Sequence, residues 1–155
     1  MTELAVIKLL REQNIPFRLI PLKAPALTVA DVVTQAQEPV NSDEICKTII
    51  TRGKSGNYYG ICLVGVDKID WGKLKRVVGE NVEIATAAEV LSVTGIEPGA
   101  VCPVLLTIPL YIDQRVLGKE HVNFGSGDLM FGLEMSPRDV VACTRSSVVD
   151  VARDS

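Results

Sequence analysis

Two apolar runs joined by a short polar segment constrain the fold of this sequence most strongly. Residues 46–52 and 58–66 are rich in β-branched, aromatic and cysteine side chains, and the segment Gly53-Lys54-Ser55-Gly56-Asn57 separates them. Turn-forming residues between two such runs are typical of a β-hairpin. We therefore predict that the fold is built around an antiparallel pair of strands at 46–52 and 58–66.

A single lysine interrupts the first of these runs. Side chains in a strand alternate between faces, so Lys47 should share a face with Ile49, while Cys46, Thr48 and Ile50 share the other. Taking an unpartnered ammonium out of water is costly. Lys47 must therefore reach the rim of the sheet, find a carboxylate partner, or bind an anionic ligand. The first alternative makes it an ordinary surface lysine, and the third makes it part of a binding site.

Two glycine-containing segments are candidates for the walls of such a site. In Gly99-Ala100-Val101-Cys102-Pro103, the glycine allows close approach of a ligand to the backbone and the proline stiffens the exit of the loop. Cys102 could line the cavity there. In Gly125-Ser126-Gly127-Asp128, the glycines could expose backbone N–H groups to an anion or a carbonyl. The alternative for both segments is an ordinary turn.

The remaining patterns predict an α+β fold with hairpins and a mixed sheet. Capping residues and Gly or Pro signals bound the expected helices, and Asp113 is expected to cap a turn. The expected helices lie at 2–14, opened by Thr2, at 28–36, at 70–79, at 86–95 and from 136 onward. Further strands are expected at 17–22, 82–85, 104–107, 110–112, 122–124, 129–133 and 147–151.

Length and composition limit the class of protein. The chain has 155 residues, of which 47% are hydrophobic and 23% charged, and this predicts one globular domain over residues 1–155. Charged residues interrupt every apolar run before it reaches the roughly 18 residues of a membrane span. The first residues lack the pattern of a signal peptide, so we expect a cytoplasmic protein without a membrane partner.

Four widely spaced cysteines and one histidine do not form a zinc-binding pattern, so neither a metal nor another cofactor is expected. Cys62 and Cys143 stand in apolar surroundings and are expected to be small buried hydrophobes. The formal net charge is -3, and the densest cationic run is Lys73-Leu74-Lys75-Arg76. This balance argues against a protein that grips DNA or a long RNA by its phosphates.

Several short segments occur in a fixed order along the chain: 43–50, 85–90, 94–95, 99–103, 111–113 and 124–127. That order resembles the YbaK/ProX family. The resemblance runs from about Thr2 to Val151. The family includes the editing domain inserted into bacterial prolyl-tRNA synthetases, and its freestanding members hydrolyse the ester of mischarged aminoacyl-tRNA.

The resemblance implies a curved mixed β-sheet flanked by helices and a trans-editing hydrolase. The expected substrate is a small noncognate amino acid, such as cysteine or alanine, on tRNA for proline. Its partners would be the 3′ end of aminoacyl-tRNA and, as a further candidate, prolyl-tRNA synthetase. Lys47 corresponds to a lysine that binds the carbonyl or phosphate side of the terminal adenosine. The residues expected around the substrate are Gly99, Cys102, Pro103, Gly125, Ser126 and Gly127.

Some features leave alternatives open. Family members that remove alanine often carry Asn-Phe-His where this chain has Asn123-Phe124-Gly125, and the role of that histidine is not expected for His121. The chain is closer to the YbaK/ProX-like branch of the family that has glycine in this loop, and the substrates of that branch include cysteinyl-tRNA for proline. Trp71 and the cations at 73–76 could contact terminal nucleotides or could form a solvated helix face. The alternative function is a non-catalytic module that binds a nucleotide or an aminoacyl-adenylate, or that partners a synthetase.

Overall fold

The computed structural model describes residues 4–26 and 28–154, and it confirms an α+β fold with mixed sheet pairing. In these residues the α-helices are α1 (Ala5–Glu12), α2 (Val29–Gln35), α3 (Trp71–Val78), α4 (Ala87–Thr94) and α5 (Pro137–Cys143). The strands are β1 (Arg18–Pro21), β2 (Cys46–Gly53), β3 (Tyr58–Val64), β4 (Val82–Ile84), β5 (Leu110–Asp113), β6 (Val122–Gly125), β7 (Phe131–Met135) and β8 (Ser146–Val149). None of the helices in the described part of the chain is long and apolar enough to cross a membrane.

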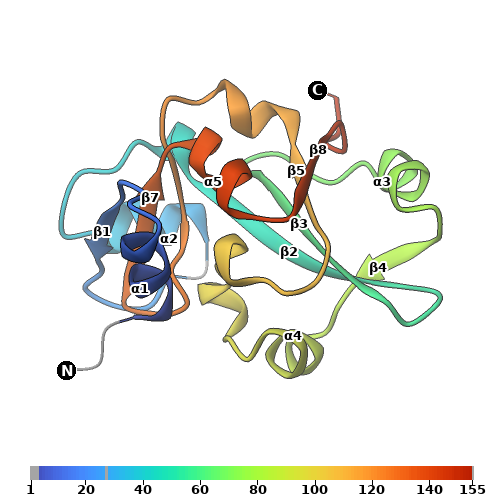
Figure 1. The fold of residues 1–155 in the computed structure, drawn as a ribbon, viewed down its shortest axis with the longest axis horizontal. Coiled ribbons are helices and arrows are strands. Elements are labelled where there is room, and N and C mark those ends of the chain that lie inside the picture. The colour runs from blue at the N-terminus through green and yellow to red at the C-terminus, as the bar shows by residue number, and fades with distance from the viewer. Residues whose placement is uncertain (1–3, 27, 155) are drawn as a thin grey trace.

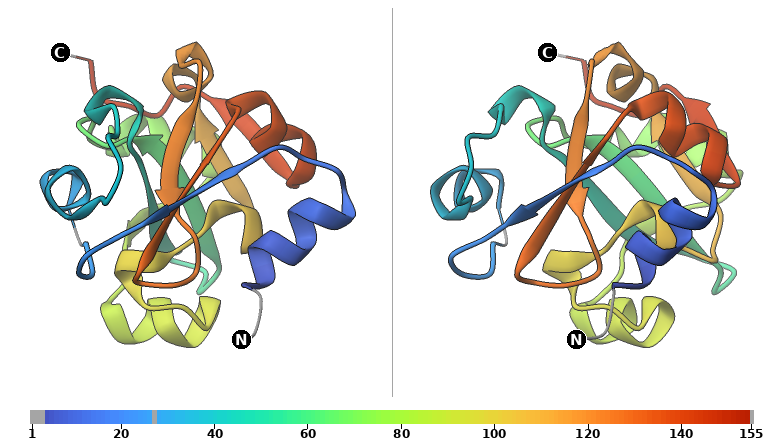
Figure 2. Two further views of the ribbon diagram at one scale, coloured as in Figure 1. Left: turned by 90° about the vertical axis from the view of Figure 1, so that its left-hand side faces the viewer. Right: turned by 60° about the vertical axis from the view of Figure 1, so that its left-hand side comes forward.

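The strands form two sheets. One has three antiparallel strands in the order β1-β7-β6, and the other has five strands in the order β4-β2-β3-β5-β8. The β3–β5 and β5–β8 pairs are parallel and the rest of the larger sheet is antiparallel. Figure 1 shows β1, β7, α1 and α2 at one end of the molecule and α3 and β4 at the other. In both views of Figure 2, the three-stranded sheet crosses in front of β2 and β3.

The predicted hairpin is confirmed and forms the centre of the larger sheet. β2 and β3 pair from Cys46 opposite Val64 to Arg52 opposite Tyr58, with Lys47 opposite Leu63. An isolated parallel bridge between Ile45 and Asn123 joins the start of β2 to β6 of the smaller sheet. The two sheets therefore meet at the end of the hairpin that carries Lys47.

The main core lies between the two sheets, where the apolar faces of α1 and α5 also pack. Its fully or nearly fully buried members come from both sheets and both helices: Val6, Leu10, Cys62, Ile112, Val122, Leu133, Met135 and Val140. A second cluster packs under α3 on the opposite face of the larger sheet and includes Ile61, Leu63, Leu74 and Val151. Each face of the hairpin is thus covered, which explains why its strands read as nearly continuous apolar runs.

The ends of two helices follow the predicted capping chemistry. The Asp70 side chain accepts a hydrogen bond from the Lys73 amide at 3.0 Å, and Gly79 ends α3 with a φ of 92°. Thr86 and Glu89 form a complete capping box at the start of α4. The predicted cap at Thr2 lies outside the described residues, and α1 begins after Leu4.

One expected strand is absent, and another begins later than predicted. Residues 104–107 do not form a strand, because Pro103 starts a 3-10 turn over Pro103–Leu105, in which the Leu105 amide donates to the Cys102 carbonyl. The strand expected at 129–133 begins only at Phe131. The reason is a turn before it, in which the Phe131 amide donates to the Asp128 carbonyl. Local apolar content does not reveal such turns.

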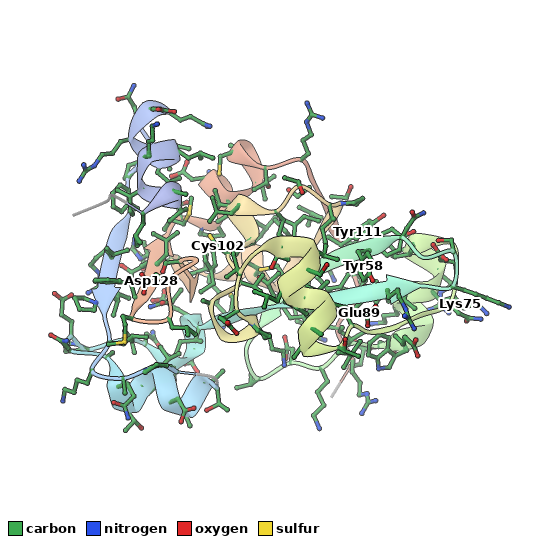
Figure 3. The ribbon with its side chains drawn as sticks, turned by 90° about the horizontal axis from the view of Figure 1, so that it is seen from below. Tyr58, Lys75, Glu89, Cys102, Tyr111 and Asp128 are labelled. Carbon is green, nitrogen blue, oxygen red and sulfur yellow. The ribbon has the colours of Figure 1, made fainter. Side chains whose placement is uncertain are left out.

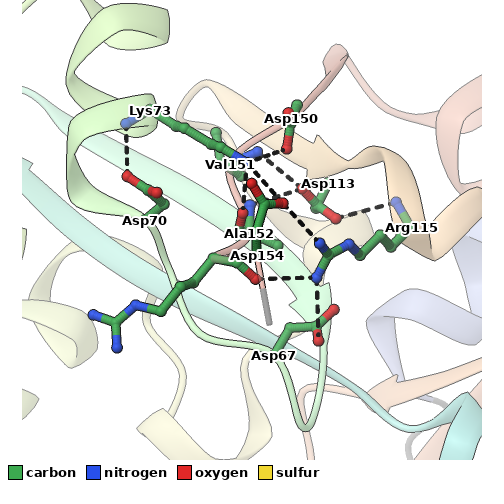
Figure 4. Close-up of polar contacts among 10 residues, drawn as sticks. Asp67, Asp70, Lys73, Asp113, Arg115, Asp150, Val151, Ala152 and Asp154 are labelled. Atoms are coloured by element: carbon green, nitrogen blue, oxygen red, sulfur yellow. Dashed lines mark hydrogen bonds and ion pairs between the residues drawn. The ribbon is translucent and has the colours of Figure 1, made fainter.

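Asp113 caps a turn, as expected, and also fixes the C-terminal segment (Figure 4). Its side chain is fully buried. One carboxylate oxygen accepts hydrogen bonds from the Val151 and Ala152 amides at 2.9 and 3.0 Å, and the other accepts from the Arg115 amide at 3.1 Å. This carboxylate therefore joins the end of β5 to the segment that follows β8.

We expect Asp113→Ala to lower the free energy of unfolding by about 3 kcal/mol, because three backbone donors lose a charged acceptor in a buried place. The matched control is Asp43→Ala, since Asp43 is exposed and its removal should change stability by less than about 0.5 kcal/mol. Urea unfolding of both variants measures the difference. Equal stability of the two variants would contradict the assigned role of Asp113.

Candidate active site

A cavity of about 340 Å³ opens where the two sheets meet. This volume is within the range of small-molecule binding sites. The Asp128 side chain marks this end of the molecule in Figure 3, opposite Lys75. Most of its lining comes from the start of β2, from α2, from the 98–101 segment, from β6 and from the connection between β6 and β7. The residues that line it are Leu22, Ala26, Thr28, Val29, Val32, Ile45, Cys46, Lys47, Thr48, Gly65, Pro98, Gly99, Val101, Asn123, Phe124, Gly125, Asp128, Leu129, Phe131 and Gly132.

Lys47 is the sole cation, and Asp128 the sole carboxylate, among the described residues that line the cavity. The Lys47 side chain is half-buried, and its Nζ donates a hydrogen bond to the backbone carbonyl of Asp67. Burial lowers the pKa of Lys47, the Asp67 carboxylate opposes that shift, and Lys68 adds to it. Of the three alternatives for this lysine, the structure shows a position on the cavity wall with a carbonyl as its polar partner.

The two glycine-containing segments contact each other beside the cavity. The Gly127 amide donates a hydrogen bond to the Ala100 carbonyl at 2.8 Å. A Cβ at Gly125 would lie 2.5 Å from the Val101 carbonyl oxygen and 2.7 Å from that of Ala100. Position 125 therefore admits only glycine in this arrangement. The close approach gives a physical reason why this chain has Asn123-Phe124-Gly125 and no side chain at that point.

The residues predicted from the sequence divide into two groups. Lys47, Gly99 and Gly125 come together on the lining. The others are absent from the lining: Cys102, Pro103, Ser126 and Gly127.

The thiol of Cys102 is fully enclosed in the main core, and this burial raises its pKa to about 12. Ser126 is equally enclosed, and its hydroxyl donates to the Phe131 carbonyl at 2.7 Å. These two side chains support the loops around the cavity, which corrects the expectation that Cys102 faces it.

Sequence reasoning missed two polar residues on the lining. Thr48 Oγ1 is buried and has no hydrogen-bond partner among the described residues. Asn123 is 3% exposed and belongs to the bridge that joins the two sheets. A threonine inside an apolar run was the available signal, but strand alternation only placed Thr48 on the face of Cys46 and Ile50. Its hydroxyl is therefore a buried polar group without a described partner, beside the cavity.

The other candidate residues lie away from the cavity. His121 is exposed, and its backbone amide donates to the Glu44 carboxylate at 3.1 Å. The Lys73 ammonium pairs with Asp150 at 3.1 Å and with Asp154 at 3.3 Å, so it tethers the C-terminal segment. This cation is therefore not free for a nucleic acid.

We expect Gly125→Ala to destabilise the fold by about 1–3 kcal/mol, because the added methyl group must push the 99–101 backbone away. Gly118→Ala is the matched control, since a Cβ there meets no described atom within 4 Å. Thermal unfolding of the two variants measures the contrast. A Gly125→Ala protein as stable as the control would mean that the two segments are not held together as described.

Comparison with known proteins shows which family and which relatives the chain is similar to. The model of the family described as "Aminoacyl-tRNA editing domain" matches residues 23–143. The chain is 30% identical over 132 residues to the uncharacterized protein YwhH of Bacillus subtilis, covering 82% of this chain and 84% of that protein. It is also 33% identical over 88 residues to the proline–tRNA ligase of Staphylococcus aureus (strain Newman), which is 56% of this chain but 15% of the ligase.

Two solved structures share the fold. One, called hypothetical protein APE2540, is 31% identical with a TM-score of 0.87, covering 96% of this chain and 99% of that chain. The other is described as a candidate trans-editing enzyme for prolyl-tRNA synthetase and is 23% identical with a TM-score of 0.81, covering 99% and 100%. The family match spans most of the chain and confirms the resemblance seen in the sequence: the chain belongs to the aminoacyl-tRNA editing domain family.

Proposed function

We propose that this chain hydrolyses the ester bond of mischarged aminoacyl-tRNA, with Lys47 as the residue that binds and orients the substrate. The observation that carries the proposal is that Lys47 is the sole cationic residue among the described residues that line the cavity, whose other lining groups are mostly apolar side chains and backbone. A substrate with a carbonyl oxygen and a phosphate near its reacting end suits such a cation. Membership of the editing-domain family supports the same reaction.

Hydrolysis of the ester needs little from the protein beyond holding the ester and a water molecule in place. Water adds to the ester carbonyl carbon, and the C–O bond to the terminal ribose breaks. The amino acid leaves as its carboxylate, one proton of the water passes to the ribose oxygen, and the other is released to the solvent. Holding the ester and one water in the correct geometry lowers much of the barrier. The ammonium of Lys47 would orient the substrate and stabilise negative charge on it, without attacking it.

The cavity suits a small amino acid. Gly125 packs directly on the Ala100 and Val101 backbone, so this wall of the cavity has no room to move outward for a substrate with a larger side chain. We infer that the substrate is a small noncognate residue such as cysteine or alanine, carried on tRNA for proline. Similarity to part of a proline–tRNA ligase supports that choice of tRNA. With a net charge of -3, the chain could obtain affinity for tRNA from a synthetase that docks beside it.

The direct test is deacylation of tRNAs charged with alanine, cysteine, serine or proline. We expect release of one small amino acid by the wild-type protein and a loss of at least about 100-fold in Lys47→Ala, because the oriented charge is removed. The matched control is Lys8→Ala, an exposed lysine on α1 that is absent from the cavity lining, which should keep the wild-type rate. Circular dichroism checks that all three proteins are folded.

Two outcomes would overturn this proposal. Folded wild-type protein that releases none of the four amino acids is not a freestanding deacylase. In that case, binding of a nucleotide or an aminoacyl-adenylate analogue would support the non-catalytic alternative. Equal activity of Lys47→Ala and wild type would remove Lys47 from the reaction while leaving the activity itself in place.

The rate should also depend on the charge of Lys47. Its pKa lies below that of an exposed lysine, mainly because of burial, and the proton is lost as the pH rises through that value. We therefore expect the enzymatic rate, corrected for uncatalysed ester hydrolysis, to fall at a pH below the range where exposed lysines titrate. A rate that keeps rising through that range would contradict a role for the ammonium form.

A further inference from the structure

We propose that Asp67 and Arg115 form a clamp that positions the Lys47 ammonium, and that the C-terminal segment 150–154 holds this clamp in place. The inference rests on the proposed function of Lys47 and extends it to residues outside the cavity. Neither Asp67 nor Arg115 is on the cavity lining, so both would act through Lys47 and not on the substrate.

The first link joins Lys47 to the segment that follows β3. Its Nζ donates to the Asp67 backbone carbonyl, which therefore sets where the ammonium can lie. Asp67 belongs to a tight turn, since its amide donates to the Val64 carbonyl at 2.9 Å. The Gly65 amide ties the same turn to the Ile45 carbonyl at 2.7 Å, directly before β2. The carbonyl that receives the ammonium is thus fixed to the strand that carries Lys47.

The second link joins Asp67 to Arg115 (Figure 4). Nη1 of the guanidinium lies 3.6 Å from the Asp67 carboxylate. The same guanidinium donates to the Arg153 carbonyl and pairs with Asp154, both at 3.2 Å. The backbone amide of Arg115 is held by the buried Asp113 carboxylate. The guanidinium thus bridges the turn at Asp67 and the C-terminal segment at Arg153 and Asp154.

The third link is backbone pairing between the C-terminal segment and residues 67–70. The Asp70 amide donates to the Val151 carbonyl at 2.8 Å, and the Arg153 amide donates to the Lys68 carbonyl at 2.7 Å. An isolated antiparallel bridge between Ile69 and Ala152 lies between these bonds. The turn is therefore held from two sides, by the arginine and by the last described residues of the chain.

The clamp also sets the charge near the ammonium. The Asp67 carboxylate raises the pKa of Lys47 and so opposes the lowering by burial, while Lys68 lowers it further. Asp128 is the carboxylate on the lining of the same cavity. Removing the charge of Asp67 should therefore reduce the fraction of protonated Lys47 at alkaline pH, even though the carbonyl that receives the hydrogen bond remains.

The test compares Asp67→Asn, Arg115→Gln and the conservative Arg115→Lys. Arg138→Gln is the control, because Arg138 is an exposed arginine that makes no ion pair with the described residues. For each protein we would measure the melting temperature, kcat and KM of deacylation, and the titration of the Lys47 side chain by NMR with labelled lysine. The Lys47 signal is assigned with Lys47→Arg.

We expect Arg115→Gln to lower kcat by about threefold to thirtyfold with a smaller change in KM, and Arg115→Lys to restore part of the loss. Asp67→Asn should move the Lys47 titration to lower pH and the alkaline fall of the rate with it. Unchanged titration and kcat in both variants would overturn the clamp. If the wild type shows no deacylation, the titration still decides: a shift in Asp67→Asn supports the clamp while the proposed function fails.

Discussion

The close approach of two backbone segments is the constraint on which the candidate site depends. Gly125 at the end of β6 packs on the Ala100 and Val101 backbone, and the Gly127 amide donates to the Ala100 carbonyl. This contact joins the smaller sheet to the segment that follows α4, and the cavity opens beside it. A side chain at position 125 would force the segments apart, so the shape of the cavity follows from the absence of one Cβ atom.

A half-buried ammonium is the other defining feature. The fold has apolar clusters on both faces of the hairpin, and a lysine in such surroundings lowers stability unless something offsets the lost hydration. Here one carbonyl and one nearby carboxylate, both from Asp67, offset part of it. Residues that conflict with local packing are often functional. The proposed editing reaction would explain the lysine at this position, because its positive charge would interact with negative charge on the substrate.

Much of the fold could be predicted because its signals are local. The hairpin at β2 and β3, the Asp70 cap of α3 and the capping box of α4 each depend on residues a few positions apart. The site was harder to predict, because its contacts link distant segments. No local pattern shows that Cys102 is enclosed by the core, that Thr48 Oγ1 has no described partner, or that Lys47 reaches a carbonyl twenty residues away. The family resemblance predicted Lys47 and the two loops as parts of the site, and the structure shows which of their residues line the cavity.

The most direct measurement of the central claim is binding of a substrate analogue followed by NMR. The probe is an adenosine whose 3′ position carries alanine through an amide, which the protein cannot hydrolyse as an ester. Our account predicts shifts of the amide signals of Lys47, Gly99 and Gly125, and at least tenfold weaker binding to Lys47→Ala, about 1.4 kcal/mol. Shifts confined to a different surface, such as the hairpin turn at Ser55 and Gly56, or equal affinity for the variant, would contradict it.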